Sequence, residues 1–141
     1  MQILILQGPN INLLGFKSSK IEEHLTLGKL NKEIRLVSKN HNVDLKFLQT
    51  HKSFQAVNFL QRNRRKANGL LFTPSSWARS NYTILETVNL INIKTSVVYF
   101  DEPYSFGTTE KESIFRGPNT KSFTGKPISA SLKGMEYLLN Q

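Results

Sequence analysis

Asn10 is the first residue of the chain whose side chain suits chemistry, because its carboxamide offers both a hydrogen-bond donor and an acceptor. It ends a Gly-Pro-Asn turn that follows the apolar run at residues 3–6. This pattern predicts a buried parallel strand that stops at a tight turn. In open α/β sheets, ligands bind in the loops that leave the carboxyl ends of the strands. Local chemistry alone favours an ordinary turn between a strand and a helix here.

The longer segment at residues 6–15, Leu-Gln-Gly-Pro-Asn-Ile-Asn-Leu-Leu-Gly, is more specific. It closely resembles the opening motif of the type II 3-dehydroquinate dehydratases, which are lyases of the shikimate and quinate pathways. The resemblance continues through most of the chain and weakens at the positions that carry the family's chemistry. It implies a flavodoxin-like α/β fold and a homo-oligomer, either a trimer or a dodecamer.

The stretch at residues 73–79 aligns with a signature that contains a catalytic histidine in the family. A proline and Trp77 keep the register, and the histidine position is Arg79. Arginine cannot be a general acid near neutral pH, because its pKa lies above about 12, but its planar guanidinium can bind an anion. The resemblance implies that Thr73, Ser76 and Arg79 contact a ligand.

The segment after the opening motif aligns with the family's lid without a gap. Lys17 stands at the position of an arginine, and Glu22 stands at the position of the tyrosine that removes the C2 proton in the family. A carboxylate such as Glu22 could serve as that base. The favoured alternative is that Glu22, beside Glu23, is an exposed lid residue.

The signature after the fourth predicted strand has lost its reactive side chains. Val98 and Phe100 stand where the family has a glutamate and a histidine. The family holds the substrate carboxylate with backbone N–H groups just beyond this point. Pro103 has no N–H to donate, and Asp101 and Glu102 would repel a carboxylate. The sequence therefore predicts that this carboxylate site is absent.

Three further positions complete the alignment. Arg116 matches the family's arginine that contacts substrate hydroxyls, and Glu86 stands where the family has an aspartate that reaches a neighbouring subunit's site. His51 lies one place from another family histidine, and a lone histidine in a polar loop is interpreted as a surface residue.

Apolar and alternating runs separated by helical patterns predict βαβ units, a parallel sheet and helices on both faces. Strands are expected at residues 3–6, 43–47, 69–72 and 96–100, with a short strand or bend near 128. Helices are expected at 26–39 with Thr26 as cap, from Ser53 to about 66, from Ser80 or Asn81 onward, and in the tail to 139. Residues 101 to about 126 are expected to form a polar connection. The size fits one domain, residues 1–141, with a flavodoxin-like five-stranded parallel sheet, whose loops at 7–25, 48–53, 73–80 and 101–116 would build any active site.

The composition limits the kinds of partner. The chain has no cysteine, which excludes disulfides and thiolate metal sites and is compatible with the cytoplasm. No apolar stretch approaches the about 18–20 residues that cross a bilayer, and no signal peptide is evident. The net charge of +9 favours anionic partners. The basic cluster at residues 62–66 lacks interleaved aromatic residues, so nucleic acid is a less favoured partner.

Three functions remain open. The favoured one is a diverged family member with lost or strongly reduced dehydratase activity, with a pocket for a small anion lined by Asn10, Lys17, Arg79 and Arg116. The second is an active dehydratase in which Asn10 helps to stabilise the enolate and Glu22 is the base. The third, which ranks last, is a basic protein that binds nucleic acid or a scaffold. No cofactor and no metal are expected.

Overall fold

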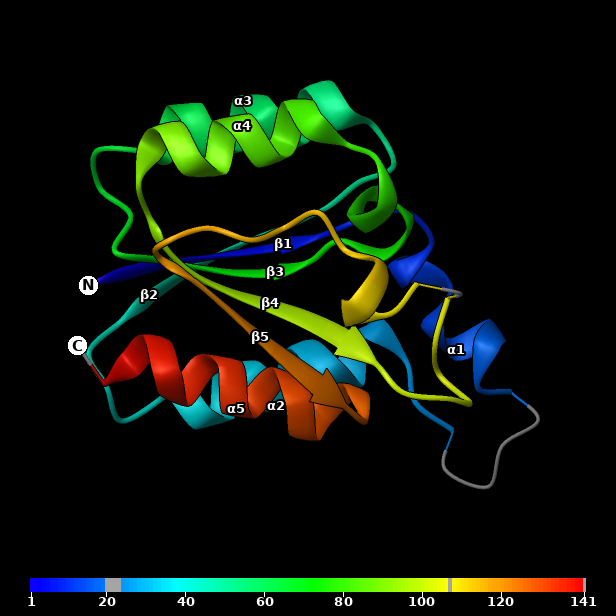
Figure 1. Cartoon of the computed structure of the whole chain (residues 1–141). Coiled ribbons are helices and arrows are strands. Elements are labelled where there is room, and N and C mark those ends of the chain that lie inside the picture. The colour runs from blue at the N-terminus through cyan, green and yellow to red at the C-terminus, as the bar shows by residue number, and fades with distance from the viewer. Residues whose placement is uncertain (20–23, 107, 141) are drawn as a thin grey trace.

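The computed structural model describes residues 1–19, 24–106 and 108–140. Their strands form one parallel sheet in the order β2-β1-β3-β4-β5 (Figure 1). The strands are β1 (Gln2–Gln7), β2 (Asp44–Gln49), β3 (Gly69–Thr73), β4 (Lys94–Phe100) and β5 (Thr120–Gly125). This order is that of the flavodoxin-like doubly wound fold, so the predicted fold class is confirmed.

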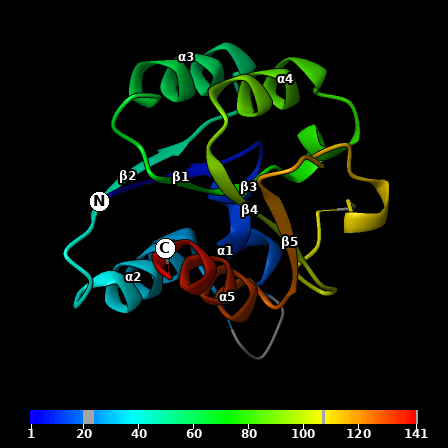
Figure 2. The same cartoon turned by 60° about the vertical axis from the view of Figure 1, so that its left-hand side comes forward.

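Helices cover both faces of the sheet, as the crossover rule requires. One face carries α2 (Leu27–Ser38) and α5 (Pro127–Leu139), and the opposite face carries α3 (Ser53–Asn63) and α4 (Tyr82–Ile91), as Figure 2 shows. Short helical segments lie between them: η1 (Ile11–Leu13), α1 (Leu14–Lys17), η2 (Ser75–Arg79) and η3 (Glu110–Glu112). Among the described residues, no helix has the length and hydropathy to span a membrane.

The apolar run of β1 divides the core into two parts. Ile3 and Ile5 pack with the α2 and α5 side, whereas Leu4 and Leu6 pack with the α3 and α4 side. All four side chains are at most 1% exposed. A strand buried on both faces needs this continuous apolar sequence, because alternate side chains enter different layers.

Helix starts follow the sequence at two of three predicted caps. The Thr26 hydroxyl accepts a hydrogen bond from the Lys29 amide at 3.2 Å, and the Asn81 carboxamide oxygen accepts one from the Ile84 amide at 3.1 Å. Such caps satisfy N–H groups that the first turn leaves free. Ser53 was predicted to cap α3 but is its first helical residue. Its hydroxyl instead accepts a hydrogen bond from the Asn81 side chain at 3.1 Å, which ties α3 to the start of α4.

The fifth strand lies elsewhere than the sequence predicted. β5 occupies Thr120–Gly125, inside the stretch interpreted as a polar connection, and Ile128 lies in the first turn of α5 instead. The reason is that β5 is an edge strand that pairs only with β4, with Val98 opposite Phe123. An edge strand covered on one face can keep polar residues, so it lacks the apolar run that marks a central strand.

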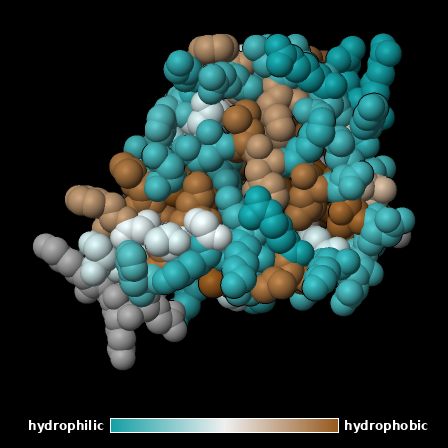
Figure 3. Space-filling view, turned by 180° about the vertical axis from the view of Figure 1, so that it is seen from behind, coloured by the Kyte–Doolittle hydropathy of each residue, from teal (hydrophilic) through white to brown (hydrophobic). Residues whose placement is uncertain are grey.

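The other edge of the sheet, β2, exposes some apolar surface. Asp44 and Lys46 are exposed, the other four residues are half-buried, and none is fully buried. Phe54, in the first turn of α3, is 62% exposed. Figure 3, viewed from behind, shows hydrophobic side chains scattered among hydrophilic ones on this face.

Candidate functional site

The carboxyl ends of β1 and β3 meet at the point where the strand order reverses, which is the usual ligand crevice of this fold. In this protein the loops that leave β1 and β3 pack directly against each other. The Gly8 amide donates to the Thr73 carbonyl at 2.9 Å. A Cβ atom added at Gly8 would lie 2.4 Å from the Pro74 carbonyl oxygen and 3.1 Å from the Trp77 ring. The glycine is therefore required because the β3 loop packs directly on it.

The loop after β2 fixes the turn that carries Asn10. The Gln49 side chain donates to the Gly8 carbonyl at 3.1 Å, and the Asn10 amide donates to Nδ1 of His51 at 3.3 Å. Asn10 has a positive φ of 69°, a conformation that asparagine tolerates better than most residues. Its side chain is exposed and does not cap η1. His51 is exposed, as the sequence suggested, yet its ring holds the Asn10 backbone.

The loop after β3 is mostly packed rather than open. Thr73 is 5% exposed and Trp77 is 8% exposed. Ser75 has a positive φ of 55°, which is an uncommon backbone conformation for a residue other than glycine. Ser76 is half-buried, and Arg79 is exposed at the end of η2. The Ala78 carbonyl accepts a hydrogen bond from the Ile114 amide at 2.8 Å, which joins this loop to the loop after β4.

A cavity of only about 20 Å³ remains among these loops. Two of its hydroxyls, Ser75 Oγ and Thr108 Oγ1, are buried and have no hydrogen-bond partner among the described residues. A space of this size with two unpaired hydroxyls in its wall suits a single water molecule. The lining residues are Ile11, Thr73, Ser75, Val98, Tyr99, Phe100, Phe106 and Thr108.

The backbone beyond β4 is committed to internal hydrogen bonds. The Asp101 amide donates to the Gly125 carbonyl at 2.8 Å, which extends the pairing with β5. The Tyr104 amide donates to the Asp101 carbonyl at 2.8 Å. Pro103 has no N–H, and the side chains of Asp101 and Glu102 are exposed. These two amides are therefore not available to an incoming carboxylate.

Tyr99 forms a buried polar cluster beside the cavity. Its hydroxyl donates to Ser113 Oγ at 2.5 Å, and the same oxygen accepts the Phe115 amide at 3.0 Å. Burial raises the pKa of Tyr99 above its ordinary value, against the opposing effect of the Ser113 hydrogen bond. The phenol therefore stays protonated at neutral pH and acts as a fixed donor.

The charged residues predicted for the site are exposed wherever the structure describes them. Lys17 is exposed at the end of α1, Glu86 is exposed on α4, and Arg116 is exposed with its guanidinium donating to the Glu110 carbonyl at 3.0 Å. None of Lys17, Arg79 and Arg116 lines the 20 Å³ cavity, whereas Thr73 does. Glu22 lies outside the described residues.

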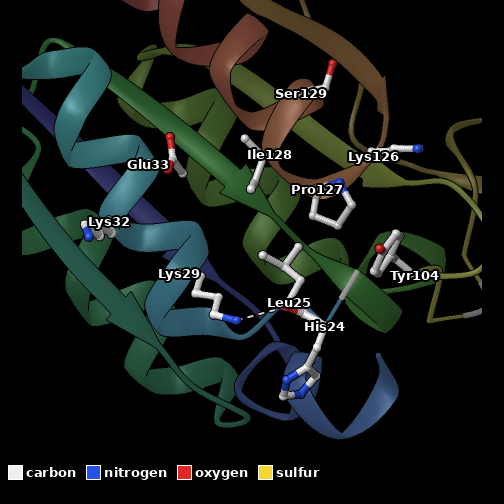
Figure 4. Close-up of a pocket in the computed structure, with 10 residues that line it drawn as sticks. All are labelled: His24, Leu25, Lys29, Lys32, Glu33, Tyr104, Lys126, Pro127, Ile128 and Ser129. Carbon is white, nitrogen blue, oxygen red and sulfur yellow. Dashed lines mark hydrogen bonds between the residues drawn. The ribbon is translucent and has the colours of Figure 1, made fainter. Parts of the chain in front are cut away.

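A larger pocket opens at the same carboxyl end of the sheet, on the face that α2 and α5 cover (Figure 4). This α2–α5 groove has a volume of about 540 Å³. Its residues come from the end of the lid region, α2, the loop after β4 and the start of α5. They are His24, Leu25, Lys29, Lys32, Glu33, Tyr104, Lys126, Pro127, Ile128 and Ser129. No sequence motif marks this groove, since it depends on segments about a hundred residues apart meeting in space. In the part of the chain that the structure describes, no group of three or more His, Asp or Glu side chains could hold a metal ion.

The strand order, the layers and the loops at one sheet edge define a flavodoxin-like α/β protein with its candidate site at the strand carboxyl ends. The family model for class II dehydroquinase matches residues 1–139. The chain therefore belongs to the type II dehydroquinase family.

Similar proteins agree with this assignment at low identity. A 3-dehydroquinate dehydratase of Clostridium botulinum is 25% identical over 138 residues, covering 98% of this chain and 94% of that protein. One of Pelotomaculum thermopropionicum is 27% identical over 114 residues, covering 81% and 79%.

Solved structures share the fold. A type II dehydroquinase from Butyrivibrio crossotus has a TM-score of 0.83 at 20% identity, covering 98% of this chain and 97% of that chain. A 3-dehydroquinate dehydratase-like protein from Bifidobacterium longum has a TM-score of 0.71 at 13% identity, covering 99% and 95%.

Proposed function

We propose that this chain is a type II dehydroquinase relative whose dehydratase activity is lost or strongly reduced. The small volume at the carboxyl ends of the central strands carries this proposal. The cavity there measures about 20 Å³, whereas small-molecule sites usually measure about 300–1,000 Å³. Phe100 and Phe106 form part of its wall, and Phe100 stands at a family histidine position. Aromatic carbon thus occupies space that a cyclic substrate would need.

The proton-transfer groups give the same indication. Arg79 replaces one family histidine and is exposed, and its guanidinium stays charged at any working pH. Phe100 replaces the other and cannot carry a proton. Losing one member of an acid–base pair costs about 10²–10⁴-fold in rate.

A dehydration assay with 3-dehydroquinate at high protein concentration tests this proposal. We expect a rate at or near the uncatalysed background. Clear turnover by the purified protein would contradict it.

The second candidate, an active dehydratase with a rearranged site, is favoured by the names of the relatives, which are 3-dehydroquinate dehydratases at 25–27% identity. In this alternative, Asn10 helps to stabilise the enolate through a held water, and Glu22 removes the proton. If turnover is found, Glu22→Gln should abolish it, and the neighbouring Glu23→Gln should not. Activity that survives Glu22→Gln would leave this alternative without a base.

We also propose that the exposed cations at this edge bind a small anion. Lys17, Arg79 and Arg116 are all exposed, and arginine favours anions with several acceptor oxygens. Thr73, Ser76 and Glu86 remain proposed contacts of the same site. Calorimetry should show sulfate or phosphate esters binding more tightly than quinate, with an affinity that falls as salt rises.

Variants locate that anion. Arg79→Ala should weaken sulfate binding most, whereas Arg65→Ala, which removes an exposed arginine beyond α3, should not. Equal sulfate affinity in wild type and Arg79→Ala would remove Arg79 from the site.

A homo-oligomer, a trimer or a dodecamer, is the proposed assembly. Large apolar side chains support it, since Phe16 is 80% exposed, Phe54 62% and Leu90 77%, and such surface is often covered by a partner. Light scattering on the purified chain should give the mass of an oligomer, and a monomer at micromolar concentration would contradict the proposal.

A further inference from the structure

The α2–α5 groove has the size and lining of a small-molecule site and is separate from the 20 Å³ cavity. Its volume of about 540 Å³ falls within the about 300–1,000 Å³ that such sites usually occupy. Leu25, Pro127 and Ile128 gather in the middle of the groove in Figure 4, and Tyr104 lies beside them. Ligand sites are typically this combination of an apolar body and a few polar groups at the rim.

The apolar floor is held in place by a buried hydroxyl. Ser18 is 0% exposed, and its Oγ accepts the Leu25 amide at 2.9 Å and donates to the Leu25 carbonyl at 2.6 Å. Leu25 is itself 8% exposed and belongs to the core cluster beneath α2 and α5. Because both backbone groups of Leu25 are satisfied within the protein, the floor is formed before any ligand binds. A preformed site loses less conformational entropy on binding.

The rim of the groove is predominantly positive. Lys29 and Lys32 on α2 and Lys126 before α5 line it, and Glu33 is the one carboxylate among the lining residues that the structure describes. In Figure 4 the Lys29 and Lys126 side chains lie on opposite sides of the apolar centre. The Lys29 amine donates to the His24 carbonyl at 3.1 Å, which uses one of its three N–H donors. The other two remain for an anion at the rim.

We propose that the α2–α5 groove binds a small organic carboxylate with an apolar body. The apolar part packs on Leu25, Pro127 and Ile128, and the carboxylate lies at the rim against the Lys29 amine, while the charge of Lys126 on the opposite side adds to the positive potential of the groove. This site is independent of the proposed loss of dehydratase activity and of the anion site that contains Arg79.

Octanoate and 1-octanol, which share an apolar chain and differ in charge, test the proposal as probes of the whole chain. We expect octanoate to shift the amide NMR signals of Leu25, Ile128 and Ser129 in a saturable way, and to bind at least about five-fold more tightly than 1-octanol, the equivalent of about 1 kcal/mol from exposed ion pairs. Equal affinities would remove the anionic half of the proposal, and shifts confined to other residues would overturn it.

Two variants and one control separate the groove from general effects. The double variant Lys29→Gln/Lys126→Gln should lower octanoate affinity about five-fold and leave 1-octanol unchanged. Ser129→Trp places a large ring at an exposed position of the lining and should block both probes. Lys133→Gln changes an exposed lysine further along α5 that does not line the groove, and it should change neither affinity. An equal loss in Lys133→Gln would overturn the proposal.

Two cross-checks distinguish this site from the other proposals. Arg79→Ala should leave octanoate binding unchanged, and the double lysine variant should leave sulfate binding unchanged. If a second copy of the chain covers the groove, Ser129→Trp will lower the oligomer mass and octanoate will give no shifts, which contradicts the proposal.

Discussion

Two regions lie at the carboxyl end of the sheet. The β1–β3 junction, where the loops after β1 and β3 meet, is filled by side chains, whereas the α2–α5 groove is open. At the junction, loops from three strands bond to each other and leave about 20 Å³. In the groove, the first turns of α2 and α5 border an apolar floor and leave a space of about 540 Å³. The loops after the central strands are therefore packed, whereas an open space of small-molecule size lies beside them, between α2 and α5.

The difference has a simple chemical origin. The junction is lined by aromatic side chains, including Tyr99, Phe100 and Phe106, which fill volume and offer few hydrogen bonds. The groove combines apolar residues with lysines at its rim. Backbone hydrogen bonds between the loops, such as the one from Gly8 to Thr73, hold the junction in this packed arrangement.

Gly8→Ala should break the closed junction and have the largest effect on stability. The new Cβ would lie 2.4 Å from the Pro74 carbonyl oxygen, which is backbone and cannot rotate away. We expect a loss of about 2–3 kcal/mol in the free energy of unfolding, measured by urea denaturation. Gly28→Ala is the control, because the one described atom that its Cβ would meet is the Thr26 hydroxyl at 3.8 Å, and alanine in α2 should be neutral or stabilising by up to about 1 kcal/mol. A loss below about 1 kcal/mol for Gly8→Ala would show that the junction adapts.

Ser18→Ala should loosen the floor of the groove and leave the junction intact. The variant removes the Ser18 hydroxyl, which makes hydrogen bonds to both the N–H and the carbonyl of Leu25. Leaving buried backbone groups unpaired costs about 1–3 kcal/mol, and octanoate affinity should fall as well. Ser19→Ala is the matched control, since its exposed hydroxyl donates to the Phe16 carbonyl and to no other group among the residues that the structure describes. A similar loss in both variants would contradict the specific role of Ser18.

Tyr99→Phe tests the polar cluster beside the junction through its pH dependence. Losing the hydrogen bond to Ser113 should cost about 0.5–1.5 kcal/mol near neutral pH. Burial raises the pKa of Tyr99 in the folded state. The unfolded tyrosine therefore ionises first as pH rises past about 10, and the wild type loses this stability at alkaline pH.

The gap between wild type and Tyr99→Phe should thus shrink above about pH 10 in urea titrations at several pH values. Tyr82→Phe changes a side chain that is 65% exposed and should show no such trend. A constant gap across pH would contradict the assignment of the raised pKa to Tyr99.

Thr108→Val should have the smallest effect, less than about 1 kcal/mol, because the removed hydroxyl has no protein partner among the described residues. A crystal structure of the wild type should show one ordered water in contact with Ser75 Oγ and Thr108 Oγ1. The variant should lack that water or hold it less well. A loss above about 2 kcal/mol would indicate that the hydroxyl is part of a stronger network.

Local sequence patterns are enough to predict the fold class, the family and most of the helices and strands. The apolar run of β1, the cap at Thr26 and the motif at residues 6–15 depend on neighbours only a few residues apart, and such local patterns are readable in one dimension. The same reasoning located the loops that meet at the sheet edge. It failed at β5, because an edge strand buries one face and carries no continuous apolar run.

Which space at the carboxyl end of the sheet is filled and which is open depends instead on how distant segments pack. Phe106 and Thr108, from the loop after β4, line the small cavity together with Thr73 and Ser75 from the end of β3. In the groove, Leu25 before α2 lies near Pro127 of α5. Volume depends on how side chains from distant segments pack, and a change of a few ångströms in one loop decides whether a cavity holds a water or a ligand. The sequence shows which charged residues a site could use, but the packing of the folded chain sets the volume between them.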